Sequence, residues 1–277
     1  MTDFDRRSVA LLALLGPLAV GGSARAQNAA PSRAAPGHDT SVATALWARP
    51  DEVAMLVYPE MTALDLFGPQ YMFAVLAGAK VHLVAKTREP VTSDTGVIIT
   101  PTATFAETPK DLTVLFAPGG SQGSSRGIFD TMQDEETRAF MADRGSRAKY
   151  VTSVCTGALI LGAAGLLKGY KATSHWAARD ALSDFGAIPT DARVVRDRNR
   201  ITGAGVTAGL DFGLTMVAEL RDATYAQSVQ LLCEYDPHPP FNAGSTHTAP
   251  ANIQAIMQEM LSPFQARLHA VAKTIPM

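Results

Sequence analysis

Cys155 is the residue whose type and position best suit it to chemistry. It lies between an apolar segment, residues 150–154, and a run of small and apolar residues, 157–161. This pattern predicts a strand that leads directly into a helix, with the cysteine in the sharp turn between them, as in a nucleophile elbow. The N–H groups and dipole at a helix start stabilise a thiolate, and the N–H of Thr156 can stabilise an anion on a substrate. We therefore predict a nucleophile rather than a buried structural cysteine.

Glycine-rich turns follow two other apolar segments. Gly119 and Gly120 come after residues 112–117. Because they have no side chains, a substrate can approach their backbone closely, so the N–H of either glycine is a candidate second donor to a substrate anion. The turn 203–207 joins a predicted strand to a helix, and we expect Gly205 and Val206 to form a wall of the pocket. This turn has neither a Walker lysine nor GxGxxG spacing, which argues against a nucleotide site.

The elements that must position these residues follow from the apolar pattern. We predict strands at 53–58, 81–85, 97–100, 112–117 and 150–154, a hairpin at 194–202, and helices at 62–77, 135–144, 175–185, 208–220, 225–234 and 252–273. This alternation favours a mostly parallel sheet with helices on both faces, with its ligand site at the carboxyl ends of the strands. We expect Gly68-Pro69 to interrupt the first helix, Ser174 to cap the third, and Cys233 to lie in the core.

Five motifs together resemble the ThiJ/PfpI superfamily: LVYPEMTALDLFGP, LFAPGG, TSVCTGALILGAAGLLKGYKATSHWA, ITGAGVTAGLDFGL and EYDPHPPFNAG. They occur in order between about Val53 and Gly244, and they are most similar to the isonitrile hydratase branch. The resemblance implies a flavodoxin-like three-layer α/β sandwich, a homodimer, and Cys155 as the nucleophile. It also implies chemistry on a small molecule without a metal or organic cofactor.

The resemblance also implies roles for three side chains. Asp65 matches an acid that lies beside the sulfur, where it can form a hydrogen bond with the sulfur and shuttle a proton. Residues 62–65 also fit a capping box, in which Asp65 would only accept a hydrogen bond from a backbone N–H. Thr156 matches a threonine whose hydroxyl assists the reaction. The alternative is that Thr156 contributes only its backbone N–H to the site. His175 is a possible pocket residue or merely a residue at a helix start. Peptidase relatives carry a histidine where Thr156 stands, so proteolysis is not expected.

The reaction implied by the resemblance is addition of water to an isonitrile, giving an N-substituted formamide through a thioimidate on Cys155, with Asp65 donating or relaying the proton. Other interpretations stay open. They are a non-catalytic sensor or binding module, a glyoxalase- or deglycase-like enzyme, and a protein that responds to oxidation of Cys155. Related transcription regulators carry a further helix-turn-helix domain, for which this chain leaves no room after Phe241.

The beginning of the chain predicts export. The first residues have the order of a cleavable signal of twin-arginine type: Arg6-Arg7, then the apolar run 9–20, then Ala24-Arg25-Ala26. We therefore expect residues 1–26 to be the signal. The mature protein is then expected in the periplasm, free of the membrane after cleavage. Residues 27–50 are rich in Ala, Pro and Ser and predict a tether, followed by one domain at 51–277. The net charge of −2 favours neither nucleic acid nor an anionic membrane, and two cysteines cannot form a disulfide scaffold.

Overall fold

A central sheet organises the part of the chain that the computed structural model describes, residues 47–120 and 127–276. The predicted signal, and the tether up to residue 46, lie outside this part. The strand order is β10-β11-β7-β6-β1-β2-β5, and neighbours run parallel except β10 and β11. The strands are β1 (Glu52–Leu56), β2 (Lys80–Ala85), β5 (Ala103–Thr104), β6 (Val114–Ala117), β7 (Tyr150–Val154), β10 (Val194–Asp197) and β11 (Arg200–Gly203).

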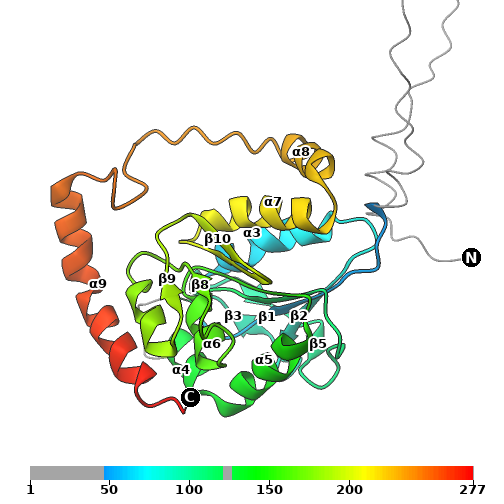
Figure 1. Ribbon diagram of the computed structural model, residues 1–277, viewed down its shortest axis with the longest axis horizontal. Coiled ribbons are helices and arrows are strands. Elements are labelled where there is room, and N and C mark those ends of the chain that lie inside the picture. The colour runs from blue at the N-terminus through cyan, green and yellow to red at the C-terminus, as the bar shows by residue number, and fades with distance from the viewer. Residues whose placement is uncertain (1–46, 121–126, 277) are drawn as a thin grey trace, which may run out of the picture.

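Helices cover both faces of this sheet (Figure 1). One layer holds α3 (Ala63–Ala74), α7 (Ala208–Leu220) and α8 (Ala223–Leu232), and the other holds α4 (Ile128–Gln133), α5 (Glu135–Arg147), α6 (Gly157–Ala163), the 3₁₀ helix η1 (Asp180–Phe185) and α9 (Ala251–Ala272). Two small pairs, β3 (Val91–Thr92) with β4 (Ile98–Ile99) and β8 (Lys171–Ala172) with β9 (Ile188–Pro189), lie outside the main sheet. The predicted α/β sandwich with a mostly parallel sheet is confirmed. Among the described helices, none has the length and apolar character to cross a bilayer.

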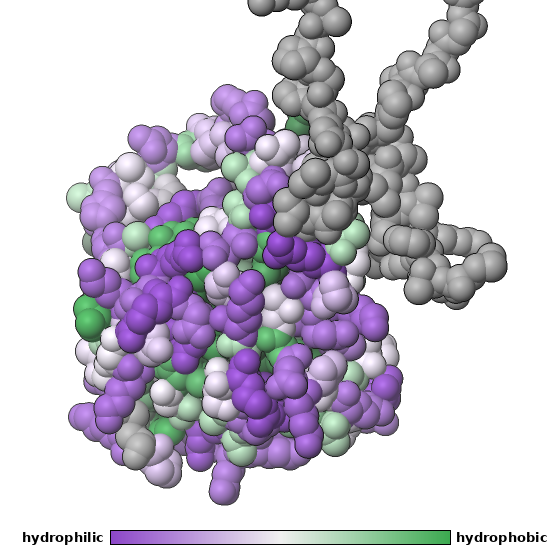
Figure 2. Space-filling view, turned by 45° about the vertical axis from the view of Figure 1, so that its right-hand side comes forward, coloured by the Kyte–Doolittle hydropathy of each residue, from purple (hydrophilic) through white to green (hydrophobic). Residues whose placement is uncertain are grey.

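The core forms where the central strands are buried on both faces. Every residue of β6 and β7 is buried, as expected for parallel strands between two helical layers. Figure 2 shows the opposite character outside, a largely hydrophilic surface with hydrophobic areas recessed between polar side chains. The apolar runs of the sequence therefore correspond to the middle of the sandwich.

The crossing of α3 and α7 explains a prediction that was wrong. Helix α3 continues through Pro69 instead of being interrupted there. A Cβ atom added at Gly209 would lie 3.2 Å from Cδ of Pro69, and one at Gly213 would lie 2.4 Å from Cγ of Met72. These glycines let the two helices pack closely, and this packing compensates for the hydrogen bond that a proline inside a helix cannot donate.

Two further local predictions were wrong. Ser174 caps no helix, because its hydroxyl donates to the carbonyl oxygen of Cys155 at 2.7 Å and the next helix, η1, begins only at Asp180. Cys233 is half-buried at the end of α8 instead of lying in the core. Helix α8 packs mainly on α7, so its distal side does not reach the sheet. Both cysteines are free thiols.

A buried ion pair anchors the chain where it enters the domain. The side chain of Arg221 has no solvent exposure, and its Nη1 lies 2.5 Å from Oδ2 of Asp51. The same guanidinium donates to the carbonyl oxygens of Trp47, at 2.6 Å, and Ala77, at 2.8 Å. The ring of Trp47 packs edge-on against Tyr225. Trp47, which the sequence placed in the tether, therefore belongs to the packed structure.

Candidate active site

Cys155 occupies the sharp turn between β7 and α6 that the sequence predicted. Its φ of +58° is a left-handed conformation that non-glycine residues rarely adopt. Three contacts hold it there: its N–H donates to the carbonyl oxygens of Gly203, at 3.1 Å, and Ala204, at 2.9 Å, and its own carbonyl accepts from Ser174. The neighbouring strand β11 and the loop after β8 thus fix the strained turn, which has the geometry of a nucleophile elbow.

The sulfur of Cys155 lies in a nearly closed site, with 4% of the residue exposed. Burial raises the pKa of the thiol well above its usual range, and the negative charge of Asp65 raises it further. The backbone N–H groups of Thr156 and Val206 face the sulfur and act in the opposite direction. The expected stabilisation of a thiolate by the helix start is present, but desolvation outweighs it. The surroundings of Cys155 therefore favour the thiol over the thiolate.

Asp65 is the acidic group beside that thiol. It lies in the first turn of α3, completely buried, and its carboxyl oxygens make no hydrogen bond of good geometry within the described residues. The groups that face it are the Cys155 thiol and the N–H of Gly119, and both lower its pKa. Burial outweighs them and raises the pKa of Asp65 to about 7. A carboxyl group that titrates near neutral pH is well suited to move a proton.

The capping-box alternative for Asp65 does not hold. In that arrangement its carboxylate would accept the N–H of Thr62. The N–H of Thr62 donates instead to the carbonyl oxygen of Gly119 at 2.9 Å, and the N–H of Ala63 donates to Oδ1 of Asp94 at 3.1 Å. The start of α3 is thus satisfied by other groups, which leaves the carboxyl of Asp65 directed at the thiol.

The loop after β6 closes the site around Gly119 and Gly120. The N–H of Gly120 donates to Oγ1 of Thr156 at 2.9 Å, so it is not directed at a substrate as we had expected. The hydroxyl of Thr156 in turn holds this loop, and its backbone N–H is the group that faces the sulfur. Tyr58 donates to the carbonyl oxygen of Pro118 at 3.0 Å. The sequence marked Tyr58 only as a strand end, because a role in holding a loop leaves no motif.

We expect the substitution Gly119→Ala to disable the site. The added Cβ would lie 2.6 Å from Oδ2 of Asp65, 2.7 Å from the nitrogen of Thr156 and 2.8 Å from Cβ of Cys155. These atoms must separate, and displacement by about 1 Å lowers a rate by about 10²-fold. Steady-state kinetics on the folded variant measure the loss. The matched control is Gly165→Ser at an open position with φ of +74°, which tests backbone strain away from the site.

His175 packs against the Gly205–Val206 turn and is not among the groups that act on the pKa of Cys155. Its ring packs against Gly205, where an added Cβ would lie 2.9 Å from Cδ2, and its Nδ1 faces the N–H of Ala177 at 3.3 Å. Burial lowers the pKa of His175 to about 4, so the ring is uncharged near neutral pH. The structure thus places His175 in a cavity wall rather than beside the sulfur, and it brings Asp65, Thr156 and Val206 to the sulfur instead.

Cys155 and Asp65 place a thiol and a carboxyl group side by side in a site from which water is largely excluded. In the described part of the chain, no three His, Cys, Asp or Glu side chains are grouped so that they could hold a metal ion. A thiol and a carboxyl group in this arrangement can carry out nucleophilic addition to an electrophilic carbon, with proton transfer to the product.

Comparison with known proteins identifies the fold family. The DJ-1/PfpI family matches residues 51–219, more than half of the chain, from β1 to the last turn of α7 and including the described residues of the Cys155 site. The chain belongs to the DJ-1/PfpI family. Isonitrile hydratase from Pseudomonas putida is 49% identical over 202 residues, which cover 73% of this chain and 86% of the hydratase.

The chain is also similar to a more distant curated protein and to a solved structure. A deglycase from Pyrococcus horikoshii is 28% identical over 152 residues, or 54% of this chain and 88% of the deglycase. The crystal structure of a ThiJ/PfpI family protein from Pseudomonas syringae is 62% identical, with a TM-score of 0.81, and the match covers 88% of this chain and 97% of that chain.

Proposed function

We propose that this DJ-1/PfpI protein is an isonitrile hydratase, which adds water to R–NC to give the formamide R–NH–CHO. The similarity to the P. putida hydratase supports this activity. The structural observation that carries it is the buried pair of Cys155 and Asp65, in which a carboxyl with a pKa of about 7 faces a thiol. An isonitrile carbon accepts both a nucleophile and a proton. The Cys155–Asp65 pair, which shares one proton, supplies the sulfur nucleophile and that proton.

The first half-reaction forms a covalent intermediate. With Asp65 ionised, its carboxylate takes the thiol proton as the sulfur attacks the isonitrile carbon, and it then delivers this proton to the same carbon. The product is the thioimidate R–N=CH–S on Cys155, and both the C–S and C–H bonds are new. The N–H groups of Thr156 and Val206 stabilise negative charge on the sulfur during attack, because they already face it in the resting site.

The second half-reaction releases the formamide. Water adds to the thioimidate carbon while the carboxylate of Asp65 takes one of its protons and passes it to the nitrogen, which gives R–NH–CH(OH)–S on Cys155. The C–S bond then breaks as the hydroxyl becomes the carbonyl of R–NH–CHO, and the hydroxyl proton passes through Asp65 to the sulfur. The enzyme thus ends with the thiol and the carboxylate with which it began, and the overall reaction consumes one water.

We further propose a homodimer that is exported to the periplasm. The export proposal rests on the paired arginines, apolar run and cleavage motif of residues 1–26. The dimer proposal is supported by the outward side of α3, where Leu64, Phe67 and Tyr71 are 48%, 39% and 38% exposed. A second copy would cover these large apolar side chains, which a soluble monomer leaves in water.

The formation of formamide tests the proposed function. The chain from Gln27 onward is incubated under reducing conditions with tert-butyl isonitrile, and proton NMR follows the new formyl signal. We expect many turnovers per Cys155 thiol. If no formamide forms although thiol titration shows Cys155 to be free, the hydratase proposal is wrong, and the sensor and the glyoxalase- or deglycase-like interpretations take its place.

A further inference from the structure

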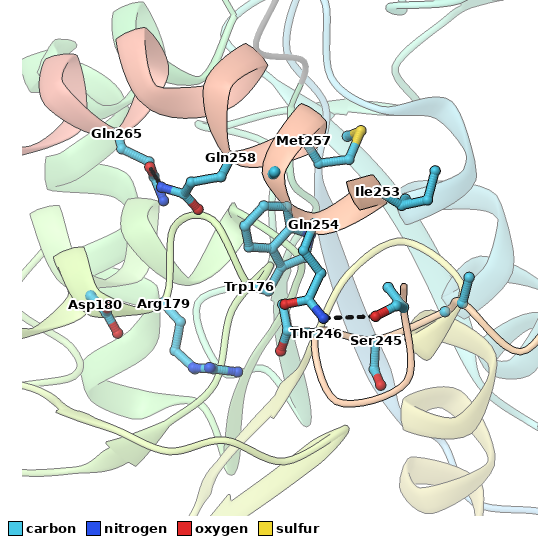
Figure 3. A pocket seen from close by; sticks show the side chains of 14 residues that line it. Trp176, Arg179, Asp180, Ser245, Thr246, Ile253, Gln254, Met257, Gln258 and Gln265 are labelled. Carbon is cyan, nitrogen blue, oxygen red and sulfur yellow. Dashed lines mark hydrogen bonds between the residues drawn. The ribbon is translucent and has the colours of Figure 1, made fainter. Parts of the chain in front are cut away.

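Two cavities of the structure meet at Trp176. The inner cavity, of about 460 Å³, is bordered by His175 and by residues 204–207. The outer cavity, of about 570 Å³, lies beneath the first half of α9. Both are lined by Trp176, Arg179 and residues 244–246, so they form one continuous cleft. In Figure 3 the indole of Trp176 lies in the centre of the outer cavity, between the Arg179 segment and α9.

The inner end of this cleft borders the Cys155 site. Val206 lines the inner cavity, and its backbone N–H faces the sulfur. Ser174 also lines it, and its hydroxyl donates to the carbonyl oxygen of Cys155 at 2.7 Å. One layer of residues therefore separates the cleft from the nucleophile, and the half-buried ring of His175 is part of that layer. The described residues thus place this cleft directly behind the groups that face Cys155.

Most charged side chains that line the cleft are paired within the protein, and Asp180 adds a carboxylate at the outer cavity. Arg179 lies 2.5 Å from Oδ1 of Asp191, and His247 lies 2.9 Å from Oδ2 of the same carboxylate. The outer cavity is also lined by the hydroxyls of Ser245 and Thr246 and by amides that bond within the protein. Gln254 donates to the carbonyl oxygen of Ala249 at 2.7 Å, and Gln258 donates to Gln265 at 2.7 Å. The remaining surface includes Trp176, Ile253 and Met257. An uncharged apolar or aromatic group fits this lining best.

Helix α9 has two dissimilar halves. Its second half docks on the domain through Leu261, Phe264 and Leu268, with the ring of Phe264 5.4 Å from that of Phe129. Its first half, residues 251–260, is exposed except for the half-buried Met257, and it stands over the outer cavity. The second half of α9 thus anchors the helix on the domain. The first half covers the outer cavity as its roof and contributes little to the hydrophobic core.

From these observations we propose that the cleft on Trp176 is a subsite for a long, uncharged, apolar or aromatic substituent of the isonitrile. The substituent extends from the carbon at Cys155 past His175, and its far end lies on the indole beneath α9. This inference rests on the proposed function and specifies the substrate class of that reaction. It assigns the roof of the subsite to the C-terminal segment 244–258.

A pair of substrates tests the subsite by kinetics. Methyl isonitrile is too short to reach Trp176, whereas 4-phenylbutyl isonitrile spans the cleft. We expect Trp176→Ala to lower the ratio of kcat/KM for the long substrate to that for the short one by about 10- to 100-fold, mainly through KM. Ile256→Ala is the matched control, because Ile256 is 58% exposed on α9 and lines neither cavity, and it should change the ratio by less than about twofold. An unchanged ratio in Trp176→Ala overturns the proposal.

Tryptophan fluorescence provides a readout that does not need turnover. The chain has two tryptophans, so the difference between the wild type and Trp176→Phe reports on Trp176. N-(4-phenylbutyl)formamide, the uncharged product, should change this signal saturably and at lower concentration than N-methylformamide. Binding without hydration of any isonitrile would overturn the proposed function but retain the subsite. A signal that varies with protein concentration and ignores the formamide would assign the cleft to a second copy of the chain and overturn the proposal.

Discussion

Replacing Cys155 with alanine is expected to abolish isonitrile hydration, with a loss in kcat of at least about 10⁴-fold. Alanine keeps the backbone of the elbow but has no atom that can form the thioimidate. Among the described residues, the other reactive group at the sulfur is the carboxyl of Asp65, which we propose carries the proton rather than attacks the carbon. The rate should therefore fall to that of the solution reaction.

The measurement is single-turnover and steady-state NMR of formamide formation, combined with mass spectrometry of enzyme quenched during turnover. The wild type should carry one added isonitrile mass on the peptide that contains Cys155, and the variant should carry none. Cys233→Ala is the control, because this free, half-buried thiol at the end of α8 should be dispensable. Retention of more than about 1% of the activity by Cys155→Ala would contradict covalent catalysis.

Replacing Asp65 with asparagine is expected to lower kcat/KM by about 10²- to 10⁴-fold, the range that general acid–base groups contribute. Asparagine has nearly the same shape but cannot carry the proton from the sulfur to carbon. In the wild type, log kcat/KM should rise with pH up to about 7, where Asp65 ionises, and then level off. In the variant, log kcat/KM should not show this rise with pH. A wild-type activity that instead falls through pH 7 would show that the protonated acid is the active form.

The same variant should be more stable than the wild type at alkaline pH. The pKa of Asp65 is raised from 3.8 to about 7 in the folded protein, so the folded state holds a proton that the unfolded chain releases. The free energy of unfolding therefore falls as the pH rises from about 4 to 7, by up to about 4 kcal/mol at about 1.4 kcal/mol per pH unit. Urea unfolding should show a gain for Asp65→Asn at pH 8 that shrinks at pH 5. An equal gain at both values would contradict burial of an ionising group.

The sequence by itself determined the sheet and the place of the nucleophile. A strand buried on both faces is a continuous apolar run, so residues 112–117 and 150–154 identified β6 and β7, and the small residues after Cys155 required a helix to begin at once. The motif around Asp65 placed an acid at the sulfur by resemblance. The two-residue strand β5 was not predicted, because so few residues carry no periodicity.

The tertiary structure decided how these residues act. The start of α6 predicted a stabilised thiolate at Cys155, but burial by surrounding segments raises the thiol pKa, and only the fold determines how much water is removed. Ser174 looks like a helix cap in sequence, yet its partner is the carbonyl of Cys155, 19 residues away. The cleft on Trp176 joins that residue to segment 244–246 and α9. Local patterns report which residues are buried, whereas the pairing of distant segments depends on the packing of the whole chain.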